Sequence, residues 1–188
     1  MKHFIIGISI MLLTLSSSFA ANFGDINIPD TLKAGKENLV LNGAGYRTKF
    51  YMKIYIGALY LPQKCADQNN IINADQAMAI KMHIVSSMIS SKKMIKAVNA
   101  GFENATGNNT NPIANEIKQL LSIFQEQIEV GDVYDLVYIP GKGVMASKNG
   151  QLKGTIKGLA FKKALFGIWL CDKPADKYLK KSMLTGNN

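Results

Sequence analysis

The stretch "LNGAGYRTKFYMKIYIGALYLP", residues 41–62, decides the fold. It is rich in aromatic and β-branched residues broken by Gly43, Gly45 and Gly57, a composition typical of β-strands. It also contains Arg47, the only arginine in a chain with 21 lysines. Arginine presents a rigid planar fork that binds a carboxylate through two parallel hydrogen bonds. Arg47 is therefore either an ordinary surface charge or an anchor for an anion.

The first twenty residues have the three-part form of a secretory signal. A basic start with Lys2 precedes an apolar run at 4–15, and small residues precede a predicted cut after Ala20. The apolar run is too short for a membrane-spanning helix, which needs about 20 residues. We therefore expect 1–20 to be a signal peptide and 21–188 to form one exported, periplasmic domain without a transmembrane segment.

The charge of the chain is strongly positive, with a net value of +9 at pH 7 and +8 without Lys2. The lysines are scattered, and no nucleic-acid-binding motif accompanies them, so we expect no nucleic-acid partner. A basic surface favours anionic ligands or anionic membrane faces. The oligomeric state is left open by these features.

The remaining motifs predict no cofactor and no metal site. Gly43 and Gly45 lack the third glycine and the following helix of a dinucleotide-binding fingerprint. His83, the only histidine after residue 20, has no neighbouring cysteine or acidic cluster, and no G-x-S-x-G elbow is present. Cys65 and Cys171 lack CxxC spacing, so they either pair in a disulfide or remain free thiols.

The pattern along the rest of the chain indicates strands, two helices, more strands and two more helices. Residues 77–85 alternate, with Met78, Met82 and Ile84 on one face and His83 on the other. Helical spacing covers 91–102 and then 112–128, with Pro112 at the start of the second helix. Three strands follow over 132–158, and two helices over 159–170 and 174–184. This order predicts an α+β fold, an antiparallel sheet covered by helices on one face, with room for an apolar pocket between them.

Tyr55 lies in the same stretch as Arg47 and would complement it, because a phenol and a guanidinium together can hold a buried carboxylate. In one uninterrupted strand the two residues would be about 26 Å apart. They converge only if the chain reverses near 48–51, a segment without the Gly, Pro, Asn or Asp that turns favour. The alternative is a bulge at Gly45 that displaces the arginine.

Together with "FKKALFGIWLCDKPADKYLKKSML" at 161–184, the opening stretch resembles the chalcone isomerase-like family, and within it the exported bacterial branch. The resemblance covers about residues 39–184. It implies an open-faced β-sandwich, in which a large antiparallel sheet packs against helices and a ligand cleft lies between them. The family contains plant enzymes that close a chalcone into a flavanone, and non-catalytic members that hold a fatty-acid carboxylate with an arginine and a tyrosine.

The resemblance places Arg47 at the family's arginine and Tyr55 at the tyrosine of the fatty-acid binders. The plant enzymes have a tyrosine and an asparagine where this chain has Ser91 and Val98, although Asn99 is one residue away. No tyrosine occurs between positions 60 and 134, so a small shift of the alignment does not restore the missing one.

We therefore expect a non-catalytic periplasmic protein that binds a small amphipathic anion such as a fatty acid. Arg47 and Tyr55 would hold the acid head, and the tail would lie against apolar residues, namely Met82, Met94, Val98 and Phe102. One alternative is an intramolecular lyase that closes an enone ring, with Arg47 and Tyr55 as candidate catalytic residues. The other is an envelope interaction protein with a collapsed cleft.

Overall fold

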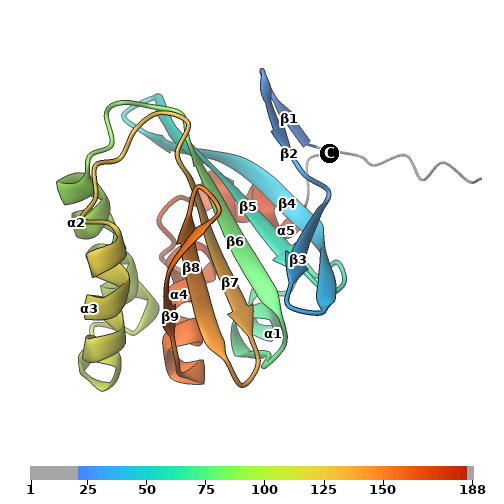
Figure 1. Cartoon of the computed structure of the whole chain (residues 1–188), viewed down its shortest axis with the longest axis vertical. Helices are drawn as coiled ribbons and strands as arrows, with labels where there is room; N and C mark the ends of the chain where they lie inside the picture. The colour runs from blue at the N-terminus through green and yellow to red at the C-terminus, as the bar shows by residue number, and fades with distance from the viewer. Residues whose placement is uncertain (1–20, 186–188) are drawn as a thin grey trace, which may run out of the picture.

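The computed structural model describes residues 21–185, so the expected signal peptide at 1–20 and the last three residues lie outside the described part. A seven-stranded antiparallel sheet is its centre, and the strands follow one another in sequence order (Figure 1). They are β3 (Thr31–Ala34), β4 (Glu37–Lys49), β5 (Met52–Leu61), β6 (Met78–Ile84), β7 (Val133–Ile139), β8 (Gly143–Lys148) and β9 (Gln151–Ile156).

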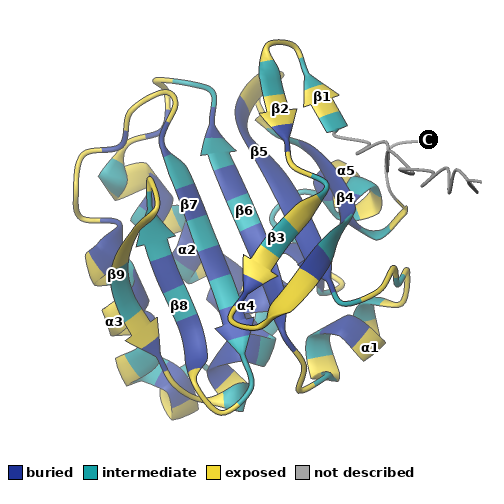
Figure 2. Ribbon diagram, turned by 45° about the vertical axis from the view of Figure 1, so that its right-hand side comes forward, coloured by how far each residue is buried: buried dark blue, intermediate teal, exposed yellow. Residues whose placement is uncertain are grey.

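The helices all cover one face of this sheet, and a short two-stranded hairpin lies on the opposite side (Figures 1 and 2). The helices are α1 (Gln68–Asn73), α2 (Ser91–Ala105), α3 (Ala114–Ile123), α4 (Leu159–Leu170) and α5 (Lys177–Thr185). The hairpin strands are β1 (Ala21–Phe23) and β2 (Ile26–Ile28). The predicted α+β architecture, an antiparallel sheet with helices on one face, is confirmed.

Two hydrophobic cores hold these layers together, because each face of the sheet buries apolar side chains. The larger core lies between the sheet and the helices and contains Met78, Met82 and Ile84 of β6, while His83 points away from it. The predicted alternation of this strand is therefore correct. The smaller core lies under the β1–β2 hairpin, where the Phe23 and Tyr46 rings meet edge to face at 5.1 Å.

The largest boundary differences from the sequence prediction are in two of the helices. The second helix starts as a 3-10 turn (Asn111–Ile113) and ends at Ile123 instead of residue 128. The last helix starts at Lys177 instead of Pro174, because the carboxylate of Asp176 caps it by accepting hydrogen bonds from the backbone N–H groups of residues 178 and 179, at 2.8 and 3.1 Å. The short elements β1, β2, β3 and α1 were not predicted.

The β4–β5 connection is a two-residue turn made by Phe50 and Tyr51, a segment that contains no favoured turn residue. Both residues adopt left-handed backbone conformations, with φ of 48° and 63°. Lys49 consequently pairs with Met52 across the turn, and a one-residue register shift between Arg47 and Thr48 then sets Arg47 opposite Tyr55. The reversal that the sequence argued against therefore occurs, at the cost of two bulky residues in a region that favours glycine and asparagine.

The expected bulge at Gly45 is absent, because Gly45 lies directly opposite Gly57 in the ladder. These two glycines instead allow α5 to approach the sheet. A Cβ on Gly45 would lie 2.8 Å from the Cβ of Ser182, and a Cβ on Gly57 would lie 2.8 Å from the Cε of Met183. An irregularity of the ladder lies instead beside the arginine, between Arg47 and Thr48, and the glycines serve close packing of a helix on two strands.

Candidate functional site

Arg47 and Tyr55 come together because they face each other on adjacent antiparallel strands. The central carbon of the Arg47 guanidinium lies 5.6 Å from the centre of the Tyr55 ring. Both side chains line one cavity between the sheet and the helices. The turn at Phe50 and Tyr51, together with the register shift between Arg47 and Thr48, thus places the two candidate residues side by side.

The cavity has a volume of about 10 Å³, which is room for roughly one water molecule. It is bounded by β4, β5 and β6 on one side and by α2, α4 and the segment before α5 on the other. Its lining residues are Arg47, Tyr55, Met82, Met94, Ala97, Val98, Ile168, Trp169 and Ala175.

The cavity brings together five of the six residues expected to bind a ligand. Arg47, Tyr55, Met82, Met94 and Val98 line it. The sixth, Phe102, does not: it is fully buried one turn further along α2, where its ring packs against Phe161 with centroids 5.7 Å apart. The helical spacing that grouped position 102 with 94 and 98 identified a buried face, and that face extends beyond the cavity.

Tyr55 is held by Trp169, whose indole Nε1 donates a hydrogen bond to the phenolic oxygen at 2.8 Å. Burial raises the pKa of Tyr55, although Arg47 and the indole donor act in the opposite direction. The phenol therefore keeps its proton at neutral pH. No residue within 21–185 accepts that proton in a hydrogen bond, so Tyr55 has a free donor at the cavity.

Arg47 is half-buried, and its Nε is a buried donor without a hydrogen-bond partner. No carboxylate in the described part of the chain forms an ion pair with its guanidinium. Asp176 is the acidic residue whose charge reaches Tyr55, but its oxygens accept hydrogen bonds from the backbone, including the Thr48 N–H at 2.9 Å. Arg47 is thus a cation that no acidic neighbour within 21–185 neutralises through an ion pair.

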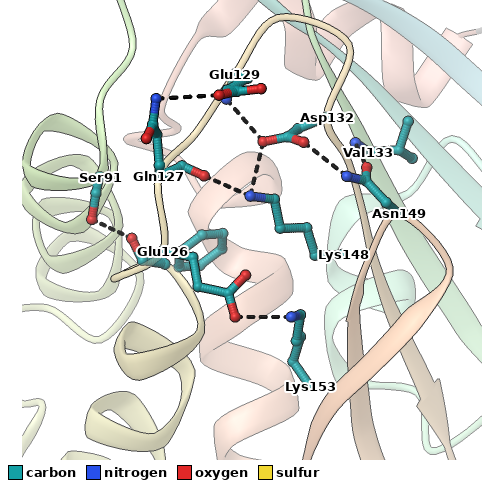
Figure 3. Close-up of polar contacts among 10 residues, drawn as sticks. Ser91, Glu126, Gln127, Glu129, Asp132, Val133, Lys148, Asn149 and Lys153 are labelled. Atoms are coloured by element: carbon teal, nitrogen blue, oxygen red, sulfur yellow. Dashed lines mark hydrogen bonds and ion pairs between the residues drawn. The ribbon is translucent and has the colours of Figure 1, made fainter.

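The rest of the cavity is apolar and offers no group suited to proton transfer. Ser91 is engaged elsewhere, because its hydroxyl donates to the backbone carbonyl of Phe124 (Figure 3). Val98 is apolar, and Asn99 does not line the cavity. Across residues 21–185, no group of His, Cys, Asp and Glu side chains is arranged to hold a metal ion. The arrangement can bind an anion, and it lacks a general acid or base tuned near neutral pH.

Sequence reasoning missed Trp169, Ala97, Ile168 and Ala175, which complete the cavity. Trp169 carried a signal, because it is the only tryptophan of the chain and lies in a largely apolar, mostly buried helix. A tryptophan in such a helix needs an acceptor for its indole N–H. Cys65 and Cys171 are not joined to each other in the structure, and the choice between a disulfide and free thiols stays a prediction.

The described helices are all too short or too polar to cross a membrane.

In comparisons with known proteins, the pattern of the family described as chalcone isomerase-like matches residues 20–185. No curated protein sequence matches the chain. Among solved structures, the crystal structure of a fatty-acid binding protein of Arabidopsis thaliana superimposes with a TM-score of 0.70 at 15% sequence identity, covering 89% of this chain and 96% of that one.

Proposed function

The chain belongs to the chalcone isomerase-like family, and we propose that it is a non-catalytic, periplasmic binding protein for a small amphipathic anion such as a fatty acid. One observation carries the proposal. The Nε of Arg47 and the hydroxyl proton of Tyr55 are donors at the same apolar cavity, and neither has an acceptor within residues 21–185. A carboxylate accepts from both and neutralises the guanidinium.

The energetics favour a charged, partly apolar guest. A buried donor without a partner costs about 1–3 kcal/mol, so a ligand that supplies the missing acceptor recovers that free energy on binding. The apolar lining then favours an alkyl or aromatic tail, since each buried methylene contributes about 0.8 kcal/mol. A small hydrophilic anion such as acetate gains only the first contribution and should bind weakly.

The cavity must open to admit such a guest, because pockets for ligands of this kind measure about 300 Å³ or more. Met82 and Met94 line the cavity, and methionine side chains change rotamer readily. Further along α2 the helix packs closely on α4, where a Cβ on Gly101 would lie 2.7 Å from the Cγ2 of Ile168. We therefore expect the start of α2, which carries Met94, to move away while this contact holds.

The fatty-acid binding stated for the Arabidopsis protein supports this function as an analogy of fold. The alternative of enone ring closure finds less support in the cavity. The raised pKa of Tyr55 keeps its phenol protonated near neutral pH, so it cannot serve as the base that deprotonates a substrate, and the side chain of Ser91 is occupied by a backbone carbonyl.

The test uses the single tryptophan as its reporter, because Trp169 lines the cavity and bonds Tyr55. Titration with laurate should change the Trp169 emission and saturate, whereas dodecanol, which has the same chain length without the charge, should bind far more weakly. Arg47→Ala should weaken laurate binding about 10- to 100-fold, the range expected for a charged hydrogen bond. Lys53→Ala removes a positive charge from the same hairpin outside the cavity and should leave the affinity unchanged. Equal affinity of the Arg47→Ala variant and the wild type would remove the anchor and the proposal with it.

Two further measurements separate the alternatives. Lipid extraction from freshly purified protein, followed by mass spectrometry, should identify a bound acid. Incubation with a chalcone, followed by absorbance, should show no acceleration over spontaneous ring closure, and an acceleration lost in Arg47→Ala would establish the lyase instead.

A further inference from the structure

The exposed apolar side chains of the protein gather at one end of the sheet. Among residues 21–185, every large hydrophobic side chain that is more than about a third exposed lies at this end. The β4–β5 turn contributes Phe50, Tyr51 and Met52, with exposures of 79%, 102% and 36%. We call this end of the molecule the rim; in Figure 1 the β4–β5 turn lies beside the loops that follow β6 and precede β7.

The other members of the rim come from segments that meet there because the strands are antiparallel. Met88 follows β6, whose last residue pairs with Tyr55. Val130 precedes β7, and Leu152 begins β9. Tyr178 is two residues from Asp176, the side chain that accepts from the Thr48 N–H. Five separate segments thus carry exposed apolar side chains at the same end of the sheet.

The β4–β5 turn at the rim has a left-handed backbone conformation that its two aromatic residues disfavour. Phe50 and Tyr51 have φ of 48° and 63°, and the turn between β8 and β9 has nearly the same geometry, with φ of 52° at Asn149 and 77° at Gly150. Asn-Gly is the favoured pair for this geometry, so the chain uses the favoured pair in one hairpin and two aromatic residues in the other. Strained backbone persists where the side chains it presents are needed.

The charges at the rim are mostly positive once internal pairs are set aside. Lys148 pairs with Asp132 at 3.0 Å and Lys153 with Glu126 at 2.8 Å (Figure 3), and these contacts also hold the loop that carries Val130. Lys49, Lys53, Lys92 and Lys177 form no ion pair with any residue the structure describes. The acidic residues at the rim that are not in these ion pairs are Glu129 and the helix-capping Asp176. Positive side chains therefore outnumber negative ones around the exposed apolar residues.

We propose that the rim docks on the surface of an anionic phospholipid bilayer, with Phe50 and Tyr51 inserted at the headgroup level and the flanking lysines on lipid phosphates. Tyrosine and phenylalanine beside lysine is the composition that membrane interfaces favour. A two-residue turn projects its side chains beyond the sheet end and fits an insertion depth of about 5–10 Å. Each lysine near an anionic surface adds an attraction that salt weakens. Arg47 lies only two residues from Lys49, so the docked rim holds the cavity close to the membrane.

The experiment is flotation of the chain beginning at Ala21, which contains both cores and every described element, with vesicles and without any fatty acid. Its outcome is therefore independent of acid binding. We expect binding to phosphatidylglycerol–phosphatidylcholine vesicles at least 10-fold tighter than to phosphatidylcholine alone, and weakened by salt. The double variant Phe50→Asn and Tyr51→Gly, which copies the pair at 149–150, should lose at least 10-fold in binding.

A matched pair of charge variants tests the orientation. Lys49→Glu is at the rim, and Lys36→Glu is in the β3–β4 turn at the opposite end of the sheet, so the two proteins have the same net charge. Binding should fall several-fold only for Lys49→Glu. The proposal is overturned if both lysine variants lose binding equally, if the turn variant binds fully, or if the wild type does not bind vesicles. The last of these results would point to a protein partner. If the double variant fails to fold, as judged by circular dichroism, Tyr51→Gly alone and the lysine pair decide.

Discussion

Replacing Phe50 and Tyr51 by Asn and Gly should make the protein more stable. The left-handed conformation costs an L-residue about 1–2 kcal/mol, and asparagine and glycine tolerate it best. Glycine offsets part of the gain, because it loses about 0.5–1 kcal/mol more conformational entropy on folding than alanine. The contact of the Lys49 ammonium with the Phe50 ring, at 5.7 Å, is exposed and worth at most about 0.5–1 kcal/mol.

The net gain for the double variant is therefore about 1–2 kcal/mol. For a domain of this size 1 kcal/mol corresponds to about 2–4 °C, so the midpoint of thermal unfolding should rise by roughly 3–6 °C. Urea unfolding followed through the fluorescence of Trp169 should show a higher midpoint with an unchanged slope. The aromatic side chains themselves contribute little, since Tyr51 is fully exposed.

The reciprocal substitution provides the control. Gly150 has φ of 77°, and a Cβ there would meet nothing within 4 Å, so Gly150→Tyr tests backbone strain without a steric clash. It should destabilise the protein by about 1–2 kcal/mol. The strain argument is refuted if the double variant at the β4–β5 turn is no more stable than the wild type, or if Gly150→Tyr has no effect.

Three other substitutions test the interior. Arg47→Met should stabilise the fold by about 1 kcal/mol in urea unfolding, because it removes a buried donor without a partner; a loss would mean that the guanidinium contributes to the fold. Lys162→Met should destabilise by about 2–3 kcal/mol, since the fully buried ammonium donates to the carbonyls of residues 71, 72 and 74 at 3.0, 3.0 and 2.7 Å. Burial lowers the pKa of Lys162 from 10.5 to about 8, so the unfolded chain binds more protons between these values, and the stability of the wild type relative to this variant should rise with pH across that window. A constant difference between the two proteins would contradict it. Gly101→Ala should cost about 1–3 kcal/mol, because its Cβ would lie 2.7 Å from Ile168; an unchanged midpoint would show that α2 already moves freely on α4.

The layers of the fold could be predicted from the sequence because they depend on periodicity. The alternation of β6 places Met82 in the main core, and the four-residue spacing of Met94 and Val98 gives the buried face of α2. These local patterns are enough to bring five of the six expected residues to one cavity. Phe102 has the same spacing, and no local pattern distinguishes a residue that lines a cavity from one that fills a core.

The geometry of the anchor could not be predicted, because it depends on a turn that breaks the local rule. Nothing in the residues between Thr48 and Met52 indicates a reversal, yet the reversal and the register shift that follows it set Arg47 opposite Tyr55. Long-range pairing of β4 with β5, and the packing of α5 against both at Gly45, outweigh the local cost. The partner of Tyr55 was equally hidden, since Trp169 is 114 residues away in sequence.

Strained backbone at bulky residues and exposed apolar side chains occur together at the rim, and this coincidence helps to explain why the β4–β5 turn is aromatic. At the opposite end, the β3–β4 and β7–β8 turns place Gly35 and Gly141 at positive φ, as backbone preference demands. The need to align Arg47 with Tyr55 does not explain Phe50 and Tyr51, because Asn-Gly would form the same two-residue turn and keep the same register. The aromatic pair adds solvent-exposed apolar surface beside lysines. This surface lies near the cavity in which the Arg47 Nε and the Tyr55 hydroxyl have no acceptor within residues 21–185. The Asn-Gly variant should be more stable than the wild type and bind laurate normally, but no longer float with anionic vesicles. That result would mean that the aromatic side chains of the turn serve membrane binding, whereas the β4–β5 pairing of Arg47 with Tyr55 serves acid binding.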